Sequence, residues 1–171
     1  MRFVCFFCFS IVFLSWNKID LNYAHSLVLK KGECDQLPEL NRKIILFVKE
    51  RLNKKVGRGE CWDLAAEALD NVKANWNHDF IFGKRVDYRN GGICPGDIMQ
   101  FKDVEIIYQE NNIYRRVKLP QHTAVIFEVK EKGSYMVAEQ NTTNTRNKVG
   151  LNPIEIKKIT KGSFEIFRPE K

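Results

Sequence analysis

The segment HTAVIFEVKEKGSYMVAEQN, residues 122–141, decides the fold class, because it contains two strand-forming runs joined by a short polar turn. Residues 122–129 and 134–139 are rich in branched and aromatic side chains, which favour β-strands. The sequence Lys130-Glu131-Lys132-Gly133 between them is typical of a tight hairpin turn. The segment therefore predicts an antiparallel pair of strands.

The position of the turn predicts which side chains of this hairpin are neighbours. With Glu131 and Lys132 at its centre, His122 faces Asn141 and Ala124 faces Glu139. Side chains alternate between the faces of a strand, so His122, Glu139 and Asn141 are expected on one face. Directly opposed Cβ atoms lie about 5 Å apart and diagonal ones about 7 Å apart, so polar contacts are within reach.

The rest of the chain places helices before further strands. Apolar residues from Leu37 to Leu52 follow a helical spacing, with Asp35 as the expected N-cap and Pro38 in the first turn. A second helix is expected to start at about Cys61. The remaining short branched or aromatic runs predict strands at 98–101, 113–117, 154–159 and 163–167. This order predicts an α+β fold, with N-terminal helices packed on an antiparallel β-sheet.

The first 24 residues have the pattern of a secretory signal peptide. Arg2 precedes an apolar run from Phe3 to Trp16, which is short for a membrane span, and the small residue Ala24 suits a cleavage site. The alternative is an uncleaved N-terminal anchor, which is the one case in which we expect contact with a membrane. Residues 25–171 are expected to form a single domain in a secreted, periplasmic or extracellular protein.

The charge of the chain is a weak indicator of partners. The net charge is +7, and it falls only to +6 when residues 1–24, which contain Arg2, Lys18 and Asp20, are removed. Basic charge attracts polyanions such as an anionic wall polymer. The chain has no recognition motif for a specific nucleic acid, no phosphate-binding loop and no zinc-ligand spacing. We expect neither a cofactor nor a metal.

Three cysteines remain after the predicted cleavage. In an oxidising compartment two of them can pair and leave one free thiol. Pairing of Cys34 with Cys94 would leave Cys61 free, although the sequence does not establish this pair.

Cys61 and His122 are the candidate nucleophile and base. The N-terminus of a helix stabilises a thiolate at Cys61, and the preceding loop Gly57-Arg58-Gly59-Glu60 offers backbone amides to a developing oxyanion. An imidazole at the sheet edge can accept the thiol proton, and Glu139 or Asn141 can orient it. The alternatives are a small buried cysteine, a strand-end histidine, and glycosylation of the sequon Asn141-Thr142-Thr143.

Four motifs together resemble a known family. They are GECWDL at 59–64, CPGDIMQF at 94–101, HTAVI at 122–126 and AEQN at 138–141. The ordered set is similar to that of CHAP amidases and endopeptidases in the NlpC/P60 papain-like superfamily. The resemblance implies a helix-borne nucleophile, Cys61, a strand-borne base, His122, and an orienting pair, Glu139 and Asn141.

The chain departs from that family in three places. Glu60 stands where many members have Gln, Gln121 replaces the usual Gly, and residues 102–120 form a long charged insert. The GECWDL motif also resembles a set of eukaryotic cysteine-proteinase-like domains.

These features predict a secreted thiol hydrolase that cleaves amide bonds of cell-wall peptides (peptidoglycan). Three other functions stay open: a catalytically inactive binding module on the same fold, a papain-like protease or acyltransferase acting on protein, and a basic secreted factor that binds nucleic acid.

Overall fold

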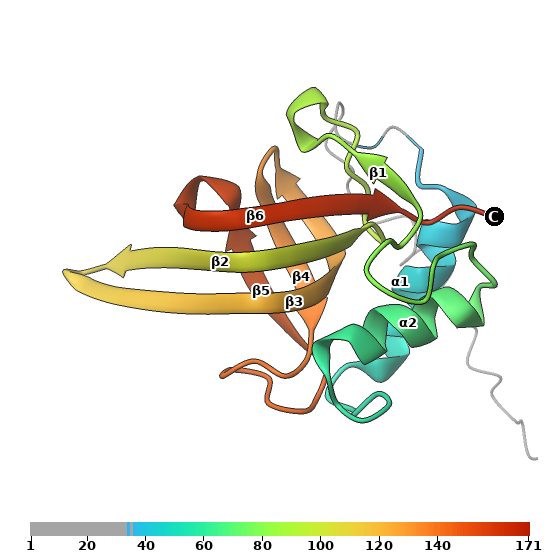
Figure 1. Cartoon of the computed structure of the whole chain (residues 1–171), viewed down its shortest axis with the longest axis horizontal. Coiled ribbons are helices and arrows are strands. Elements are labelled where there is room, and N and C mark those ends of the chain that lie inside the picture. Colours follow the sequence, from blue (N-terminus) through green and yellow to red (C-terminus); the bar gives the residue numbers. More distant parts are fainter. Residues whose placement is uncertain (1–33, 35) are drawn as a thin grey trace, which may run out of the picture.

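The computed structural model describes residue 34 and residues 36–171. The predicted signal peptide at residues 1–24 and the predicted N-cap Asp35 lie outside the described residues. Within them the chain has the predicted α+β architecture, with two α-helices on one side of a curled, six-stranded antiparallel sheet (Figure 1). No helix in this part of the chain is long and apolar enough to cross a membrane.

Both predicted helices are present. Helix α1 spans Glu39–Arg51 with Pro38 as its N-cap, and its buried side chains include Ile44 and Val48. Helix α2 spans Cys61–Asn71, so it begins at the predicted residue. Its apolar stripe, which includes Leu64 and Leu69, packs with α1 against the sheet.

The sheet has the strand order β1-β6-β2-β3-β4-β5. Its strands are β1 (Lys84–Val86), β2 (Ile98–Glu110), β3 (Ile113–Glu131), β4 (Ser134–Glu139), β5 (Gly150–Glu155) and β6 (Ile159–Arg168). Strand β1 was not predicted, because its three residues are charged or partly exposed and have no apolar pattern. The predicted strands 113–117 and 122–129 are parts of β3, and Ile156–Lys158 is a short 3-10 helix.

The hairpin turn lies one residue later than predicted. Strand β3 ends at Glu131 and β4 begins at Ser134, which leaves Lys132 and Gly133 in the turn, with φ 79° at Gly133. Two irregularities in the β3–β4 pairing compensate for this difference, so Val125 faces Ala138 as the predicted register requires. The sheet therefore has the expected alignment near the candidate site.

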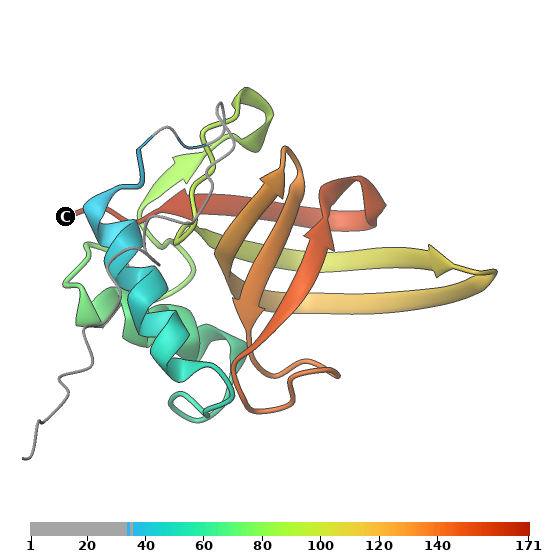
Figure 2. The same ribbon diagram turned by 180° about the vertical axis from the view of Figure 1, so that it is seen from behind.

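Residues 102–120, predicted as a charged insert, extend β2 and β3 into a long projecting hairpin (Figures 1 and 2). The hairpin bends near Asp103, which has φ 53°. Before the bend β2 is buried on both faces. Its residues in the core cluster away from the helices alternate differently on the two sides of the bend, with Met99 and Phe101 before it and Val104 and Ile106 after it. Because β2 and β3 stay paired, the inward face of β3 changes at the same point.

A disulfide and a set of hydrogen bonds to a buried carboxylate hold the loop that precedes β2 against the rest of the domain. Cys34 and Cys94 form a disulfide, which leaves Cys61 as the free cysteine of the described residues. The buried carboxylate of Asp97 accepts hydrogen bonds from Asn41 Nδ2 at 2.7 Å and Arg168 Nε at 3.0 Å. Asp97 also accepts from the Cys94 N–H at 2.9 Å, so it closes the turn and joins α1 to β6.

Candidate active site

The loop before α2 fixes the position of Cys61 at the first residue of the helix. Asp63 Oδ2 accepts hydrogen bonds from the Arg58 N–H at 2.7 Å and the Glu60 N–H at 3.1 Å. Gly57 has φ +52°, and a Cβ at this position would lie 2.9 Å from Asp63. A glycine is therefore needed where the loop passes over the carboxylate.

These hydrogen bonds to Asp63 correct the expectation that the loop offers its backbone amides to an oxyanion. The Arg58 and Glu60 amides are bonded to Asp63, and the Gly59 amide donates to the Val56 carbonyl at 3.0 Å. The Cys61 N–H differs, since the first residue of a helix has no intrahelical acceptor. The Cys61 N–H can therefore donate to an oxyanion, whereas the amides of Arg58, Gly59 and Glu60 cannot.

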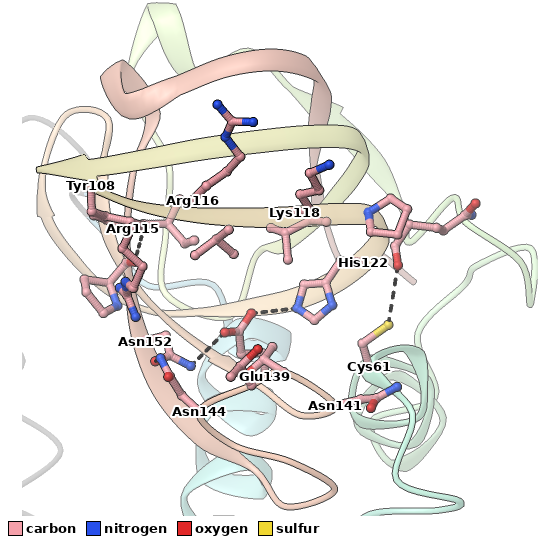
Figure 3. A pocket seen from close by; sticks show the side chains of 18 of the residues that line it. Cys61, Tyr108, Arg115, Arg116, Lys118, His122, Glu139, Asn141, Asn144 and Asn152 are labelled. Atoms are coloured by element: carbon pink, nitrogen blue, oxygen red, sulfur yellow. Dashed lines mark hydrogen bonds and ion pairs between the residues drawn. The ribbon is translucent and has the colours of Figure 1, made fainter. Parts of the chain in front are cut away.

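His122 and Glu139 form a buried pair beside Cys61 (Figure 3). The Nε2 atom of His122 lies 2.6 Å from Oε2 of Glu139, and both side chains are about 5% exposed. Glu139 is diagonal to His122 across β3 and β4, as the predicted register implies. The other ring nitrogen of His122 is left to interact with Cys61.

The thiol and the imidazole change each other's ionisation. Burial opposes ionisation of Cys61, but the hydrogen bond and charge of His122 and the backbone amides of Thr123 and Trp62 outweigh it, so the pKa of Cys61 is lowered. Burial also opposes protonation of His122, yet Cys61 and Glu139 raise its pKa to about 9. The pair therefore favours thiolate and imidazolium, the nucleophilic form of such a dyad.

Asn141, the second predicted orienting residue, does not contact His122. Strand β4 ends at Glu139, and Asn141 has φ 63°, so the alternation of the strand does not extend to it. Its Nδ2 donates to Oε2 of Glu60 at 2.6 Å. The structure thus brings Cys61, His122 and Glu139 together and directs Asn141 to the residue before the nucleophile.

Two asparagines that the sequence analysis did not identify complete the surroundings of Glu139. Asn152 Nδ2 donates to Glu139 Oε1 at 2.8 Å, and Asn144 Nδ2 donates to Asn152 Oδ1 at 2.9 Å. Asn152 lies on β5 opposite Val137, which shares a face with Glu139. Only the pairing of β4 with β5 reveals this contact, and no local motif in the sequence signals it.

Gln140 is a third residue that the sequence analysis missed. Its buried side chain accepts from the Val56 N–H at 3.2 Å and donates to the carbonyls of Val56 at 2.9 Å and Glu60 at 2.7 Å. It therefore ties the end of β4 to the loop that precedes Cys61. This contact fixes the nucleophile relative to the strand that carries Glu139.

Cys61, His122 and Glu139 open onto a cleft of about 470 Å³ between the start of α2, β3 and the β4–β5 region. Cys61 lies at one end of it, and Tyr108 and Arg115 lie at the other (Figure 3). Cys61 is partly exposed, so a bound group can reach its sulfur. No cluster of three or more metal-ligating side chains occurs in the described part of the chain.

A protein-family model matches most of the chain. A family model described as the AIM3/BBC1 cysteine proteinase-fold domain matches residues 37–171. A relative, altered inheritance of mitochondria protein 3 of Debaryomyces hansenii, is 28% identical over 137 residues. That match covers 70% of this chain and 15% of the relative, so the chain spans a small part of the relative's length.

Comparison with solved structures gives distant matches. A crystal structure of Ly7917 covers 74% of this chain and 62% of that chain, with a TM-score of 0.42 and 16% identity. A second structure, Ly7917 with the hydrolyzing product of MDP, covers 75% and 63%, with a TM-score of 0.44 and 16% identity.

Proposed function

The chain belongs to the AIM3/BBC1 cysteine proteinase-fold domain family, and from this premise we propose that it is a thiol hydrolase that cleaves amide bonds in peptides. The observation that carries the proposal is the position of His122, with one nitrogen 2.6 Å from Glu139 and the other on the side of Cys61 (Figure 3). A nucleophile, a base and an orienting carboxylate in this order are what acyl transfer through a thioester requires.

The reaction has two steps. The Cys61 thiolate attacks the substrate carbonyl and forms a carbon–sulfur bond, and the His122 imidazolium then gives its proton to the leaving amine as the carbon–nitrogen bond breaks. In the second step, His122 takes a proton from water, which attacks the thioester and releases the acid and the thiolate. The carboxylate of Glu139 holds the ring and stabilises its charged form throughout.

The Cys61 N–H is the proposed donor to the tetrahedral intermediate. It adjoins the reacting sulfur, at the positive end of the helix dipole of α2. Such a donor stabilises the negative charge that develops on the carbonyl oxygen in the transition state.

We propose peptidoglycan peptides as the first substrate class to test, in a secreted protein. The resemblance of the four motifs to CHAP amidases supports this choice. So does the net charge, +6 without residues 1–24, because basic charge favours adhesion to an anionic wall polymer. The Cys34–Cys94 disulfide supports an oxidising compartment. Protein substrates are the alternative within the same chemistry.

A catalytically inactive binding module is the second candidate, and specific observations favour it. The amides of Arg58, Gly59 and Glu60 are all occupied, so the oxyanion would have few backbone donors from this loop. Glu60 also puts an anion directly before a residue that should be a thiolate. The same cleft could then bind a peptide without cleaving it.

The test compares the wild-type protein with Cys61→Ala on purified peptidoglycan and on an unfolded protein. New amino termini are scored by mass spectrometry, under conditions that leave the Cys34–Cys94 disulfide intact. Termini from peptidoglycan that are absent with the variant would support the wall hydrolase. Termini from the unfolded protein alone would identify a protease, and no termini from either would favour the binding module.

A further inference from the structure

Three cations line the cleft, Arg115, Arg116 and Lys118. The side chain of Arg115 faces into it at the end opposite Cys61 (Figure 3). It lies on the projecting part of the β2–β3 hairpin, where β3 has not yet reached the bend, on the same face as Leu119 and Val117, which also line the cleft. The neighbouring Arg116 points to the opposite side of the strand (Figure 3). The direction of these side chains follows from the alternation of residues along β3.

Among the side chains that the structure describes, which do not include that of Glu110, no carboxylate lies within ion-pair distance of Arg115, whereas each of its cationic neighbours has one. Arg116 Nε lies 4.0 Å and Lys118 Nζ 3.8 Å from the carboxylate of Glu105. Lys158 pairs with Glu155 at 2.5 Å. Arg115 has instead an aromatic partner, since its guanidinium carbon lies 4.8 Å from the centre of the Tyr108 ring. This contact leaves its N–H donors available.

Tyr108 holds this guanidinium in place. The ring is 8% exposed, and its hydroxyl donates to the Pro153 carbonyl at 2.9 Å. Tyr108, Arg115 and Glu139 line the same cleft. The cationic end of the cleft is therefore continuous with the candidate active site.

We propose that Arg115, resting on Tyr108, is a subsite that binds a carboxylate of the peptide substrate. The inference rests on the proposed function and names the substrate class, a peptide with an acidic group several bonds from the cleaved amide. A guanidinium binds a carboxylate through two parallel hydrogen bonds, which fixes its direction as well as its position. The carboxylate is an acidic side chain or the C-terminus of the peptide.

The charges at the other end of the cleft favour this direction of binding. Glu60 lies next to Cys61 and carries a negative charge, whereas the charge of Glu139 is compensated by His122. An acidic group is repelled from the end that holds the nucleophile and attracted to the end that holds Arg115. The cleft thus orients an acidic peptide with its anion away from the reacting sulfur.

The experiment uses alkylation of Cys61 by iodoacetyl peptides, in which a carbon–sulfur bond forms and iodide leaves. The peptides carry one to four glycines followed by Glu-NH₂ or by its neutral analogue Gln-NH₂. A third series ends in Gln with a free carboxyl group, which distinguishes a terminal carboxylate from a side-chain one. Each glycine adds about 3.3 Å to the reach of an extended peptide. Second-order rate constants are compared for each length.

We expect one spacer length at which an anionic peptide reacts about tenfold faster than its neutral analogue, the gain from one charge-assisted hydrogen-bonded pair. Arg115→Gln should reduce this ratio of rate constants to about one. The matched control Arg116→Gln, which changes the charge by the same amount, should leave the ratio unchanged. A ratio near one at every length, or an equal loss in both variants, would overturn the subsite.

A second measurement separates this inference from the proposed function. Binding of the corresponding N-acetylated peptides, labelled with a fluorophore, is measured by anisotropy on Cys61→Ala protein, which has no nucleophile. Preference for the anionic peptide that depends on Arg115 would support the subsite even if the wild-type protein cleaves nothing. Hydrolysis without such a preference would refute the subsite and leave the hydrolase intact.

Discussion

The side chain of Asn152 donates from Nδ2 to Oε1 of Glu139 at 2.8 Å, the carboxylate oxygen that His122 does not use. Glu139 therefore has a partner on each oxygen, and its carboxylate cannot rotate without losing one of them. Asn144 in turn donates to Asn152. The direction of the His122 ring is thus fixed by residues from two further segments of the chain, and the predictions for this site depend on that arrangement.

Asn152→Ala should lower the rate of Cys61-dependent cleavage by about fivefold, because a hydrogen bond that orients Glu139 and contributes about 1 kcal/mol is lost. Stopped-flow or steady-state kinetics would measure the change. The substitution should act on kcat rather than KM, because Asn152 positions a residue that acts on the reacting groups. Asn144→Ala serves as a control with a smaller expected loss of rate, because Asn144 contacts Asn152 and not Glu139.

Glu139→Gln should move the alkaline limb of the pH–rate profile to lower pH. His122 must be protonated to serve as the acid, and its pKa is raised to about 9 with the help of Glu139. Activity of the wild type should therefore fall as the pH rises through about 9, and that of the variant should fall earlier. We also expect kcat to drop about 10- to 100-fold, since a charge-assisted hydrogen bond is lost. If the alkaline limb of the variant stayed at the wild-type pH, Glu139 would not control the pKa of His122.

Asn141→Ala should leave the alkaline limb of the profile in its wild-type position, because Asn141 contacts Glu60 and not His122. The rate should stay within about twofold of the wild type, as expected for an exposed substitution. The pH–rate profile of this variant, measured beside that of Glu139→Gln, separates the two residues predicted as orienters. A shift as large as that of Glu139→Gln would contradict the observed geometry.

Cys34→Ser should lower the free energy of unfolding by about 2–5 kcal/mol, because the disulfide with Cys94 closes a long loop of the unfolded chain. Urea titration followed by tryptophan fluorescence would measure this. Cys94→Ser should have a similar effect, and a reductant should destabilise the wild type but neither variant. Alkylation of Cys61 in the folded variants should remain as fast as in the wild type.

Much of the fold could be predicted because its signals are local. The apolar stripe from Cys61 onward identified α2 and its first residue, and the branched runs identified β4 with its observed bounds, Ser134–Glu139. The turn between β3 and β4 was predicted one residue too early. The prediction of the register near His122 was still right, because two irregularities in the strand pairing cancel the error. Such irregularities depend on packing across the sheet, which a single strand sequence does not encode.

The sequence by itself determined that helices precede an antiparallel sheet, that Cys61 begins a helix, and that His122 and Glu139 share a face. Each of these follows from the period of a helix or a strand, which is a property of the local backbone. The tertiary structure alone decided that Asn141 turns to Glu60, that Asn152 reaches Glu139, and that Arg115 faces the cleft. These contacts depend on where a strand ends, which strand lies beside it and where a hairpin bends, and those features arise only when distant segments pack together.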